Sequence, residues 1–223
     1  MQAVDDSVGE LLDYLDEHDL AENTLVIYTS GQGFLLGDHG WFDKRPMFDE
    51  SFTMPFVVRW PDGIPAGTRV EEMVTNVDVA ATLLEAAGIS PTALPEQQGR
   101  SFLPLLRGER VEDWPEADYY RYWEHDDPEH HAPAHYGVRT RTHTYVHYDN
   151  DGPGTPGSSG AVMPEEIELY DDIADPQQLT DIADDPAAAG IREELAALLA
   201  RLQEELGDAP YEGPDTPRLE WPR

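Results

Sequence analysis

The sequence predicts an α/β fold in its first half, followed by a small antiparallel sheet that packs on a C-terminal helix. Two apolar runs, at residues 24–29 and 54–60, are short, continuous and rich in β-branched and aromatic side chains. Such runs are typical of strands that are buried on both faces of a parallel sheet. Amphipathic helices are predicted on either side of them, at residues 5–18 and 77–87. The order helix, strand, loop, strand, helix is typical of α/β proteins.

Each of the two predicted helices has an apolar face and residues that suit its ends. In the first helix the apolar positions follow the spacing i, i+3, i+4 and i+7: Val8, Leu11, Leu12 and Leu15. Three residues near its start can cap it: Asp5, Asp6 and Ser7. In the second helix the apolar face consists of Val77, Ala80, Ala81, Leu84 and Ala87. Thr75 or Asn76 can cap that helix, Asp78 reads as a helix-start residue, and Gly88 suits the position after its end.

The second half of the chain has a different pattern. Three short segments rich in aromatic residues and Thr predict antiparallel strands: residues 119–123, 136–140 and 144–148. Residues 152–160 are rich in Gly, Pro and Ser and predict a flexible loop. A helix over residues 187–206 ends at Gly207, and one face of it is lined by Ile191, Leu195, Leu198, Leu199 and Leu202.

These patterns divide the 223 residues into three parts. We expect an α/β part at residues 1–110, an α+β subdomain at residues 111–207 and a loosely held tail at residues 208–223.

The charge of the chain excludes two classes of partner. The sequence has 14 Lys and Arg against 46 Asp and Glu, a net charge of 14 − 46 = −32. Nucleic acids and anionic membrane surfaces both require a basic footprint, so neither is expected as a partner. The acidic residues are spread along the chain, and Lys44 is the only lysine. This distribution favours a protein adapted to concentrated salt, because at about 1 M salt the Debye length falls to about 3 Å.

Further features restrict the chemistry and the compartment. The chain has no Cys, which excludes disulfides, thiolate metal sites and a thiol nucleophile. No apolar stretch approaches the length of a membrane span, and the first residues do not resemble a signal peptide. We therefore expect a cytoplasmic location.

Residues 28–51 contain the side chains that are best suited to form a functional site. Polar side chains of several kinds follow a predicted strand, at the edge where α/β sheets bind ligands: Gln32, Asp38, His39, Asp43 and Lys44. Four glycines among them allow sharp turns: Gly31, Gly33, Gly37 and Gly40. Because Lys44 supplies a point charge and His39 a tunable donor, the segment suits an anion or a metal–anion pair. The alternative is a polar loop that solvates the edge of a sheet.

A second cluster, His125 to His131 with His135, leaves three interpretations open. It can be a transition-metal site, a loop that faces the substrate, or a solvated loop. Its spacing matches no zinc pattern, and Pro128 and Pro133 predict an irregular loop.

Several motifs in order resemble the C-terminal half of the sulfatase family, within the alkaline phosphatase-like superfamily. The motifs are Ser30-Gly-Gln-Gly33, Leu36-Gly-Asp-His-Gly40 with Lys44, Met54 to Pro61, Asn76 to Leu84, Tyr136 to Thr140 and Glu168 to Asp171. The resemblance extends to about residue 206. It implies a partial alkaline phosphatase-like fold, with a parallel or mixed sheet and flanking helices, followed by the family's C-terminal subdomain.

The resemblance also implies an activity and roles for residues. Family members are calcium-dependent hydrolases of sulfate esters, with a formylglycine nucleophile made from a Cys/Ser-x-Pro-x-Arg motif. By this resemblance Gln32 is a metal ligand, and Lys44 is a catalytic residue that binds a sulfate oxygen. His39 is a catalytic residue that supports this site, and His135 binds substrate at the rim. The implied substrate is a small sulfate ester or a sulfated saccharide.

Two departures from the family pattern alter this expectation. Gly31 stands where the family has a metal-binding Asp, so calcium binding is expected to be weakened or absent. The nucleophile motif does not occur in the sequence. We therefore expect a C-terminal portion of a sulfatase that is inactive alone, with an exposed sheet edge that another chain or segment covers. The alternatives are a non-catalytic partner or pseudoenzyme that complements a separately encoded N-terminal half, and a phosphodiester or phosphonate ester hydrolase of the same superfamily.

Overall fold

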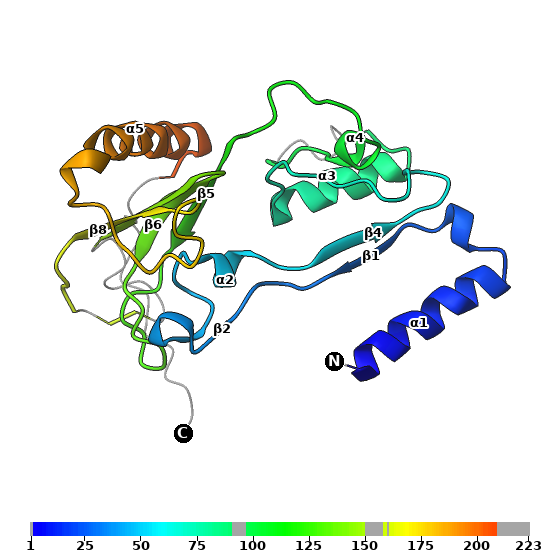
Figure 1. Cartoon of the computed structure of the whole chain (residues 1–223), viewed down its shortest axis with the longest axis horizontal. Coiled ribbons are helices and arrows are strands. Elements are labelled where there is room, and N and C mark those ends of the chain that lie inside the picture. The colour runs from blue at the N-terminus through cyan, green and yellow to red at the C-terminus, as the bar shows by residue number, and fades with distance from the viewer. Residues whose placement is uncertain (1, 91–96, 150–157, 160, 209–223) are drawn as a thin grey trace. The chain divides into compact units, whose positions relative to one another are not determined.

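The computed structural model describes residues 2–90, 97–149, 158–159 and 161–208 (Figure 1). The chain forms two compact units. The first consists of Met1–Ser30 with Pro55–Pro115, and the second of Gly31–Met54 with Glu116–Arg223. The segment that carries the predicted site therefore packs with the C-terminal half of the chain. The domain limits expected near residues 110 and 207 stay a prediction.

The first unit contains a two-stranded antiparallel sheet. Strand β1 (Val26–Thr29) pairs with β4 (Phe56–Arg59), with Val26 opposite Arg59 and Thr29 opposite Phe56. The expectation of strands buried on both faces of a parallel sheet is wrong here: Val57, for example, is 61% exposed. In the described part of the chain no third strand pairs with these two. The segment between them has no crossover helix of the length that a parallel pair requires.

The N-terminal helix is confirmed, but its predicted caps are wrong. Helix α1 spans Gln2–Glu17, so the candidate caps lie inside it. The Ser7 hydroxyl donates to the carbonyl of Ala3, one turn back, and Asp6 accepts from the Gln2 amide. None of the described residues of α1 is buried, and Leu11 is 66% exposed. The apolar face of this helix is therefore only partly covered in the described chain, since Val8, Leu12 and Leu15 are half-buried.

Helix α3 (Asn76–Ala86) follows its sequence signals closely. Thr75 and Asp78 form a capping box, in which the Thr75 backbone N–H donates to Asp78 Oδ2 at 2.9 Å. The other Asp78 oxygen accepts from the Arg100 backbone N–H at 2.8 Å. Gly88 adopts a positive φ of 73° beyond the helix end. The prediction that Asp78 is a helix-start residue is confirmed.

Further short elements and a small core complete the first unit. The elements are the 3₁₀-helix η1 (Ala21–Asn23) and helix α4 (Leu103–Leu106). The buried core consists of Phe102, Leu105 and Trp114. Among the described residues, none of the helices of either unit has both the length and the apolar character needed to cross a membrane.

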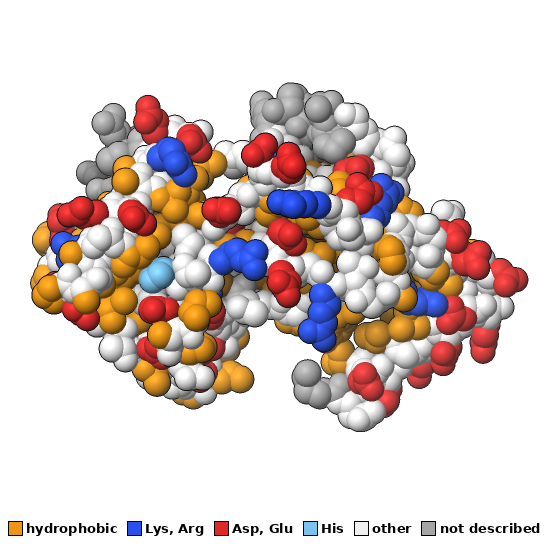
Figure 2. Space-filling view, turned by 45° about the horizontal axis from the view of Figure 1, so that its top comes forward, with side chains coloured by type: hydrophobic (Ala, Val, Ile, Leu, Met, Phe, Trp, Pro, Cys, Tyr) orange, Lys and Arg blue, Asp and Glu red, His pale blue; other side chains and the backbone are white. Residues whose placement is uncertain are grey.

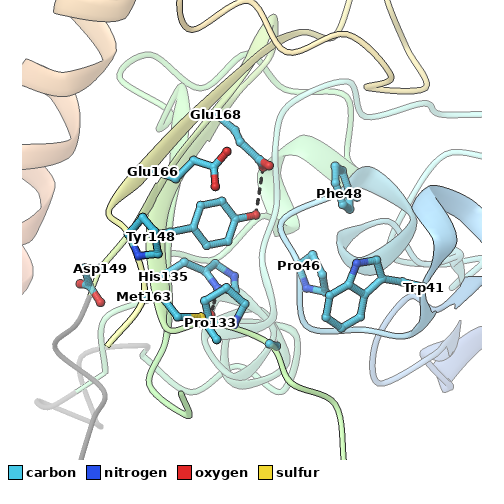
Figure 3. A pocket seen from close by; sticks show the side chains of 12 residues that line it. Trp41, Pro46, Phe48, Pro133, His135, Tyr148, Asp149, Met163, Glu166 and Glu168 are labelled. Carbon is cyan, nitrogen blue, oxygen red and sulfur yellow. Dashed lines mark hydrogen bonds between the residues drawn. The ribbon is translucent and has the colours of Figure 1, made fainter. Parts of the chain in front are cut away.

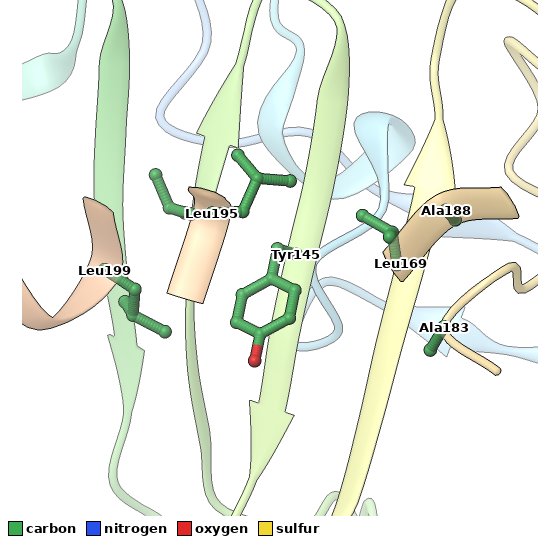
Figure 4. Close-up of a cluster of buried hydrophobic side chains, with 7 residues drawn as sticks. Tyr145, Leu169, Ala183, Ala188, Leu195 and Leu199 are labelled. Atoms are coloured by element: carbon green, nitrogen blue, oxygen red, sulfur yellow. The ribbon is translucent and has the colours of Figure 1, made fainter. Parts of the chain in front are cut away.

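The second unit is built on an antiparallel sheet, as predicted, but the sheet has a fourth strand in addition to the three that were predicted. Its strands are adjacent in chain order: β5 (Ala117–Tyr122), β6 (His135–Thr140), β7 (His143–Tyr148) and β8 (Glu166–Asp171). Helix α5 (Ala189–Leu206) lies against one face, preceded by the 3₁₀-helix η4 (Pro186–Ala188). On this face Val138, Tyr145 and Leu169 pack with Leu195 and Leu199 of α5 (Figure 4). The antiparallel sheet on a C-terminal helix is confirmed.

The end of α5 also agrees with the sequence. Gly207 adopts a φ of 69° and terminates the helix. Asp208, expected in the tail, accepts hydrogen bonds from the Tyr119 hydroxyl and from Arg121. The predicted tail beyond Asp208 and most of the predicted loop 152–160 lie outside the described residues. Within that loop, Ser158 and Ser159 are described, and both bond to the backbone of His125.

Residues 31–54 cover the opposite face of the same sheet. Their elements are β2 (Leu35–Leu36), the 3₁₀-helix η2 (Asp38–Gly40), β3 (Phe42–Asp43) and α2 (Asp49–Phe52), with β2 and β3 paired antiparallel. Met47 is buried against Gly137 in β6, where a Cβ atom would overlap both the Met47 side chain and the Tyr145 carbonyl. Arg139 of the same strand binds Asp49 through Nε at 2.8 Å and Nη2 at 3.0 Å. Contacts with β6 therefore help to seat the segment on the sheet, and Arg45 and Phe48 add contacts with β5 and β8.

Replacing Gly137 tests this seating. We expect Gly137→Ala to lower the free energy of unfolding by about 1–3 kcal/mol, because the added methyl overpacks the contact with Met47. Gly190→Ala in α5 is the matched control, since a Cβ there meets no atom within 4 Å. We expect it to be neutral or stabilising by up to about 1 kcal/mol. Urea unfolding of both variants measures the effect, and equal stability of the two would contradict the seating.

Candidate functional site

The structure brings the predicted metal ligand and the predicted sulfate-binding residue together. The Gln32 amide Nε2 donates to the backbone carbonyl of Lys44 at 3.1 Å, across 12 residues of sequence. The backbone N–H of Gly33 donates to the Ser51 carbonyl at 3.1 Å. A Cβ at position 33 would overlap the Glu50 carbonyl, so glycine allows this close approach. The side chains of Gln32 and Lys44 are both exposed.

His39 lies in the same segment and has partners of its own. Its ring stacks on Phe48, with centroids 3.6 Å apart and an interplanar angle of 0°. Its Nε2 lies 3.7 Å from an oxygen of Glu50. His39 has a φ of 53°, a left-handed conformation that is uncommon outside glycine. The turn Asp38–Gly40 therefore holds the imidazole against a buried phenyl ring.

Asp43, next to Lys44, connects this segment to the histidine-rich stretch. Its carboxylate forms an ion pair with Arg45 and lies 2.6 Å from His130 Nε2. His130 Nδ1 lies 2.8 Å from Asp127 Oδ1. The imidazole of His130 therefore lies between two carboxylates, those of Asp43 and Asp127. Burial acts to raise the pKa of Asp127, but hydrogen bonds from His130 and two backbone N–H groups lower it below its ordinary value.

The histidine-rich stretch is partly buried and partly exposed. His125 and Asp127 are buried, whereas Glu129 and His131 are exposed. In the described part of the chain no three His, Asp or Glu side chains converge in a way that would hold a metal ion. The ion pair of His130 with Asp43 ties the stretch to the segment that carries Lys44. Its role as a loop that faces the substrate stays a prediction.

His135 was expected at the rim of the site, but the structure buries it. Its side chain is 1% exposed, and its Nδ1 lies 2.8 Å from the Pro133 carbonyl. Strand alternation places it among three tyrosine rings, those of Tyr120, Tyr122 and Tyr148, at centroid distances of 5.2–5.7 Å. Burial lowers the pKa of His135 to about 4, against the opposing effect of the Pro133 and Arg45 carbonyls. The imidazole is therefore neutral at pH 7.

A cavity of about 300 Å³ lies beside His135 (Figure 3). Trp41, Pro46 and Phe48 from the segment 31–54 form one wall, and side chains of the sheet face them. The full lining is Trp41, Pro46, Phe48, Ala132, Pro133, His135, Tyr148, Asp149, Met163, Pro164, Glu166 and Glu168.

The polar groups of the cavity are partly buried. Tyr148 donates its hydroxyl to Glu168 at 2.9 Å. Burial raises the pKa of Tyr148 well above its ordinary value and also raises the pKa of Glu168. Apart from His135, the sequence analysis did not identify the residues that line the cavity. The period-2 alternation of β7 and β8 was the available signal, since it places Tyr148, Glu166 and Glu168 on one face of the sheet.

Gly31, where the resemblance implies a metal-binding Asp, is exposed, and a side chain at this position would meet no obstacle. A Cβ built there would contact no atom within 4 Å, and the backbone has no positive φ. The fold therefore does not require glycine at this position.

Comparisons with known proteins identify relatives along most of the chain. Residues 37–205 match the family model described as N-sulphoglucosamine sulphohydrolase, C-terminal. An N-acetylglucosamine-6-O-sulfatase of Bacteroides thetaiotaomicron is 38% identical over 208 residues, which cover 92% of this chain and 35% of that protein. Arylsulfatase K of Homo sapiens is 32% identical over 185 residues, 80% of this chain and 31% of that protein.

Solved structures agree with the sequence matches. One, determined in complex with its substrate D-glucosamine-2-N,6-O-disulfate, has a TM-score of 0.82 and 37% identity over 96% of this chain and 41% of its own. A phosphonate monoester hydrolase of Agrobacterium radiobacter has a TM-score of 0.74 and 27% identity over 91% of this chain and 39% of its own. The chain thus spans between 31% and 41% of the length of these relatives.

The neutral state of His135 predicts a specific dependence of stability on pH. The pKa is about 4 in the folded chain, against an ordinary value of 6.5. Above pH 6.5 His135 is neutral in both the folded and the unfolded chain, so it does not lower the free energy of unfolding. As the pH falls from 6.5 to 4 the unfolded chain binds the proton first, so the free energy of unfolding falls, by about 3 kcal/mol in total.

Urea unfolding of wild type and His135→Asn at several pH values between 7 and 4.5 measures this contribution. We expect a shallower decline in the variant. His18→Asn, at an exposed position in the same chain, is the control and should retain the full decline. Parallel declines in wild type and His135→Asn would show that His135 does not resist protonation.

Proposed function

The chain belongs to the sulfatase family, and we propose that it is the part of a sulfuric ester hydrolase that holds the sulfate group. The observation that carries the proposal is the hydrogen bond from Gln32 to the carbonyl of Lys44, which keeps the two residues with implied roles in one place. Lys44 binds a sulfate oxygen and stabilises the charge that develops in the transition state. It is the only lysine of the chain.

The other site residues support this role in different ways. His39, stacked on Phe48, is a second catalytic candidate in the same segment. His135, neutral and buried in the cavity wall, contributes to substrate binding from the sheet. Asp43 is held by Arg45 and His130, and it fixes the backbone directly before Lys44. The histidine-rich stretch thereby positions Lys44.

The described residues do not fit a complete calcium site. Ca²⁺ requires six to eight oxygen ligands, several of them carboxylates. Gln32 offers one neutral amide oxygen, and Gly31 offers no side chain. We therefore propose that this chain contributes at most one side-chain ligand to the calcium that the family uses and binds it weakly or not at all alone.

Sulfated saccharides are the substrate class that we propose. Relatives with matches along most of this chain include a protein named for N-acetylglucosamine-6-O-sulfate, and a solved relative holds a disulfated glucosamine. A phosphonate ester hydrolase is the second candidate, supported by the solved relative from Agrobacterium radiobacter. Turnover of an aryl sulfate compared with an aryl phosphonate distinguishes the two.

Hydrolysis of a sulfate ester requires a segment that bears the nucleophile, on another chain or on a longer form of this one. The motif Cys/Ser-x-Pro-x-Arg does not occur in the 223 residues. Large apolar side chains of α1, β1 and β4 are exposed and suit coverage by such a segment: Val4, Leu11, Tyr28 and Val57. We propose that such a segment, on another chain or on a longer form of this one, completes the enzyme; a pseudoenzyme that complements a separately encoded half without chemistry is the alternative.

We also propose that the chain works in concentrated salt. Asp and Glu side chains are scattered over the visible face rather than gathered in one block (Figure 2). With a net charge of −32, self-repulsion destabilises the folded chain unless salt screens it.

Co-expression tests the proposed function. We expect the chain alone to show no turnover of an aryl sulfate in high salt with calcium. Co-expression with the reading frame upstream, matured to formylglycine, should yield turnover. In that complex we expect Lys44→Ala to lower kcat by about 10²–10³, the usual effect of removing a group that stabilises transition-state charge. Arg110→Ala, at an exposed position, is the control.

Two results would overturn the proposal. One is robust turnover by the purified chain alone, since it lacks the nucleophile. The other is unchanged kcat in Lys44→Ala. If no combination of this chain with a partner segment gives turnover, the result favours the pseudoenzyme.

A further inference from the structure

We propose that the cavity between Trp41 and the sheet binds an uncharged pyranose ring and excludes a second anionic group. The proposal rests on the proposed function and adds to it the kind of saccharide that the protein accepts.

The shape of the cavity suits a single sugar ring. Its volume of about 300 Å³ lies at the lower end of the range for ligand pockets, roughly 300–1,000 Å³. Trp41, Pro46 and Phe48 present flat apolar faces on one wall (Figure 3). Such faces suit the C–H face of a pyranose, and amphipathic aromatic groups provide rigid contact area at low entropic cost.

The opposite wall accepts hydrogen bonds and carries negative charge. Glu166 is exposed at the start of β8, and Glu168 is partly buried two residues further along. The third carboxylate, Asp149, is compensated by Arg121, whose Nη2 lies 3.4 Å from it. None of the lining residues is Lys or Arg. A sulfate or carboxylate in the cavity would therefore meet like charge without a compensating cation, whereas sugar hydroxyls would find acceptors.

His135 lines the cavity and adds no positive charge to it. Its ring lies against the backbone carbonyls of Pro133 and Arg45, and burial keeps it neutral at pH 7. An anionic ligand therefore gains no cation from His135.

Binding of unsulfated sugars to the full chain tests the proposal without requiring turnover. The probes are N-acetylglucosamine, which is neutral, and glucuronate, which carries a carboxylate on a similar ring. Saturation-transfer NMR at the lowest salt that keeps the chain folded measures both affinities. We expect N-acetylglucosamine to bind with a Kd in the millimolar range and glucuronate to bind at least ~10-fold more weakly.

Two variants separate the contributions of the walls. Glu166→Gln should strengthen glucuronate binding by about 3- to 10-fold, because it removes one repelling charge, and should leave N-acetylglucosamine within about 2-fold. Glu165→Gln is the matched control, since Glu165 is the neighbouring exposed carboxylate and does not line the cavity. Trp41→Ala should weaken N-acetylglucosamine by at least ~10-fold. Near-native circular dichroism of each variant confirms that it is folded.

Three outcomes would overturn the proposal: equal binding of the two sugars, no binding of either, or the same response of glucuronate to Glu165→Gln and Glu166→Gln. The first two leave the proposed function intact if the complemented enzyme still hydrolyses an aryl sulfate. Conversely, sugar binding without turnover in any complemented form would support the cavity and count against the proposed function.

Discussion

Arg139, near the end of β6, reaches two carboxylates that come from distant parts of the chain, Asp49 in α2 and Asp172 just after β8. The distances are 2.8 and 3.0 Å to Asp49 and 2.8 Å to Asp172. Gln178 extends the network, because it accepts from the Asp49 backbone N–H and donates to Asp172. Burial raises the pKa of Asp172, and the guanidinium opposes that shift. Removing one partner of such a pair is expensive, since it leaves an unpaired charge in a poorly solvated place. The position of residues 31–54 on the sheet, and with it the position of Lys44, depends on this network.

Much of the second unit could be predicted from sequence because its strands are covered by parts of the same chain. Three of the four strands and the apolar face of α5 were predicted, and Leu195 and Leu199 of that face pack on Val138 and Tyr145 of the sheet. The pairing of β1 with β4 could not be read in the same way. A continuous apolar run looks the same whether its neighbours run parallel or antiparallel, and whether they belong to this chain or to another. The capping box of α3 was predictable because it is local, involving Thr75 and Asp78 only.

The site was predictable where it depends on one segment and unpredictable where it depends on several. Gln32 and Lys44 lie in one segment, and the family resemblance, not their spacing alone, indicated that they belong to one site. The cavity was not predictable, because Trp41 and Glu168 are far apart in sequence and meet only when residues 31–54 lie on the sheet. The ion pair of Asp43 with His130 was not predictable for the same reason, since these two residues are also far apart in sequence. For His135, the position at the start of β6 was evident, but its burial follows from tyrosines on both neighbouring strands.

Amide hydrogen exchange in an Arg139→Met variant tests the central claim, that this side chain holds the segment that carries Lys44 on the sheet. Two amides report on the segment: Asp49, bonded to Gln178, and Gly33, bonded to Ser51. Amides of α5 report on the rest of the second unit. We expect the segment amides to exchange at least ~10-fold faster in the variant while α5 keeps its protection, since the segment opens as a local unit. Unchanged protection of Asp49 and Gly33, or an equal loss of protection in α5, would contradict the claim.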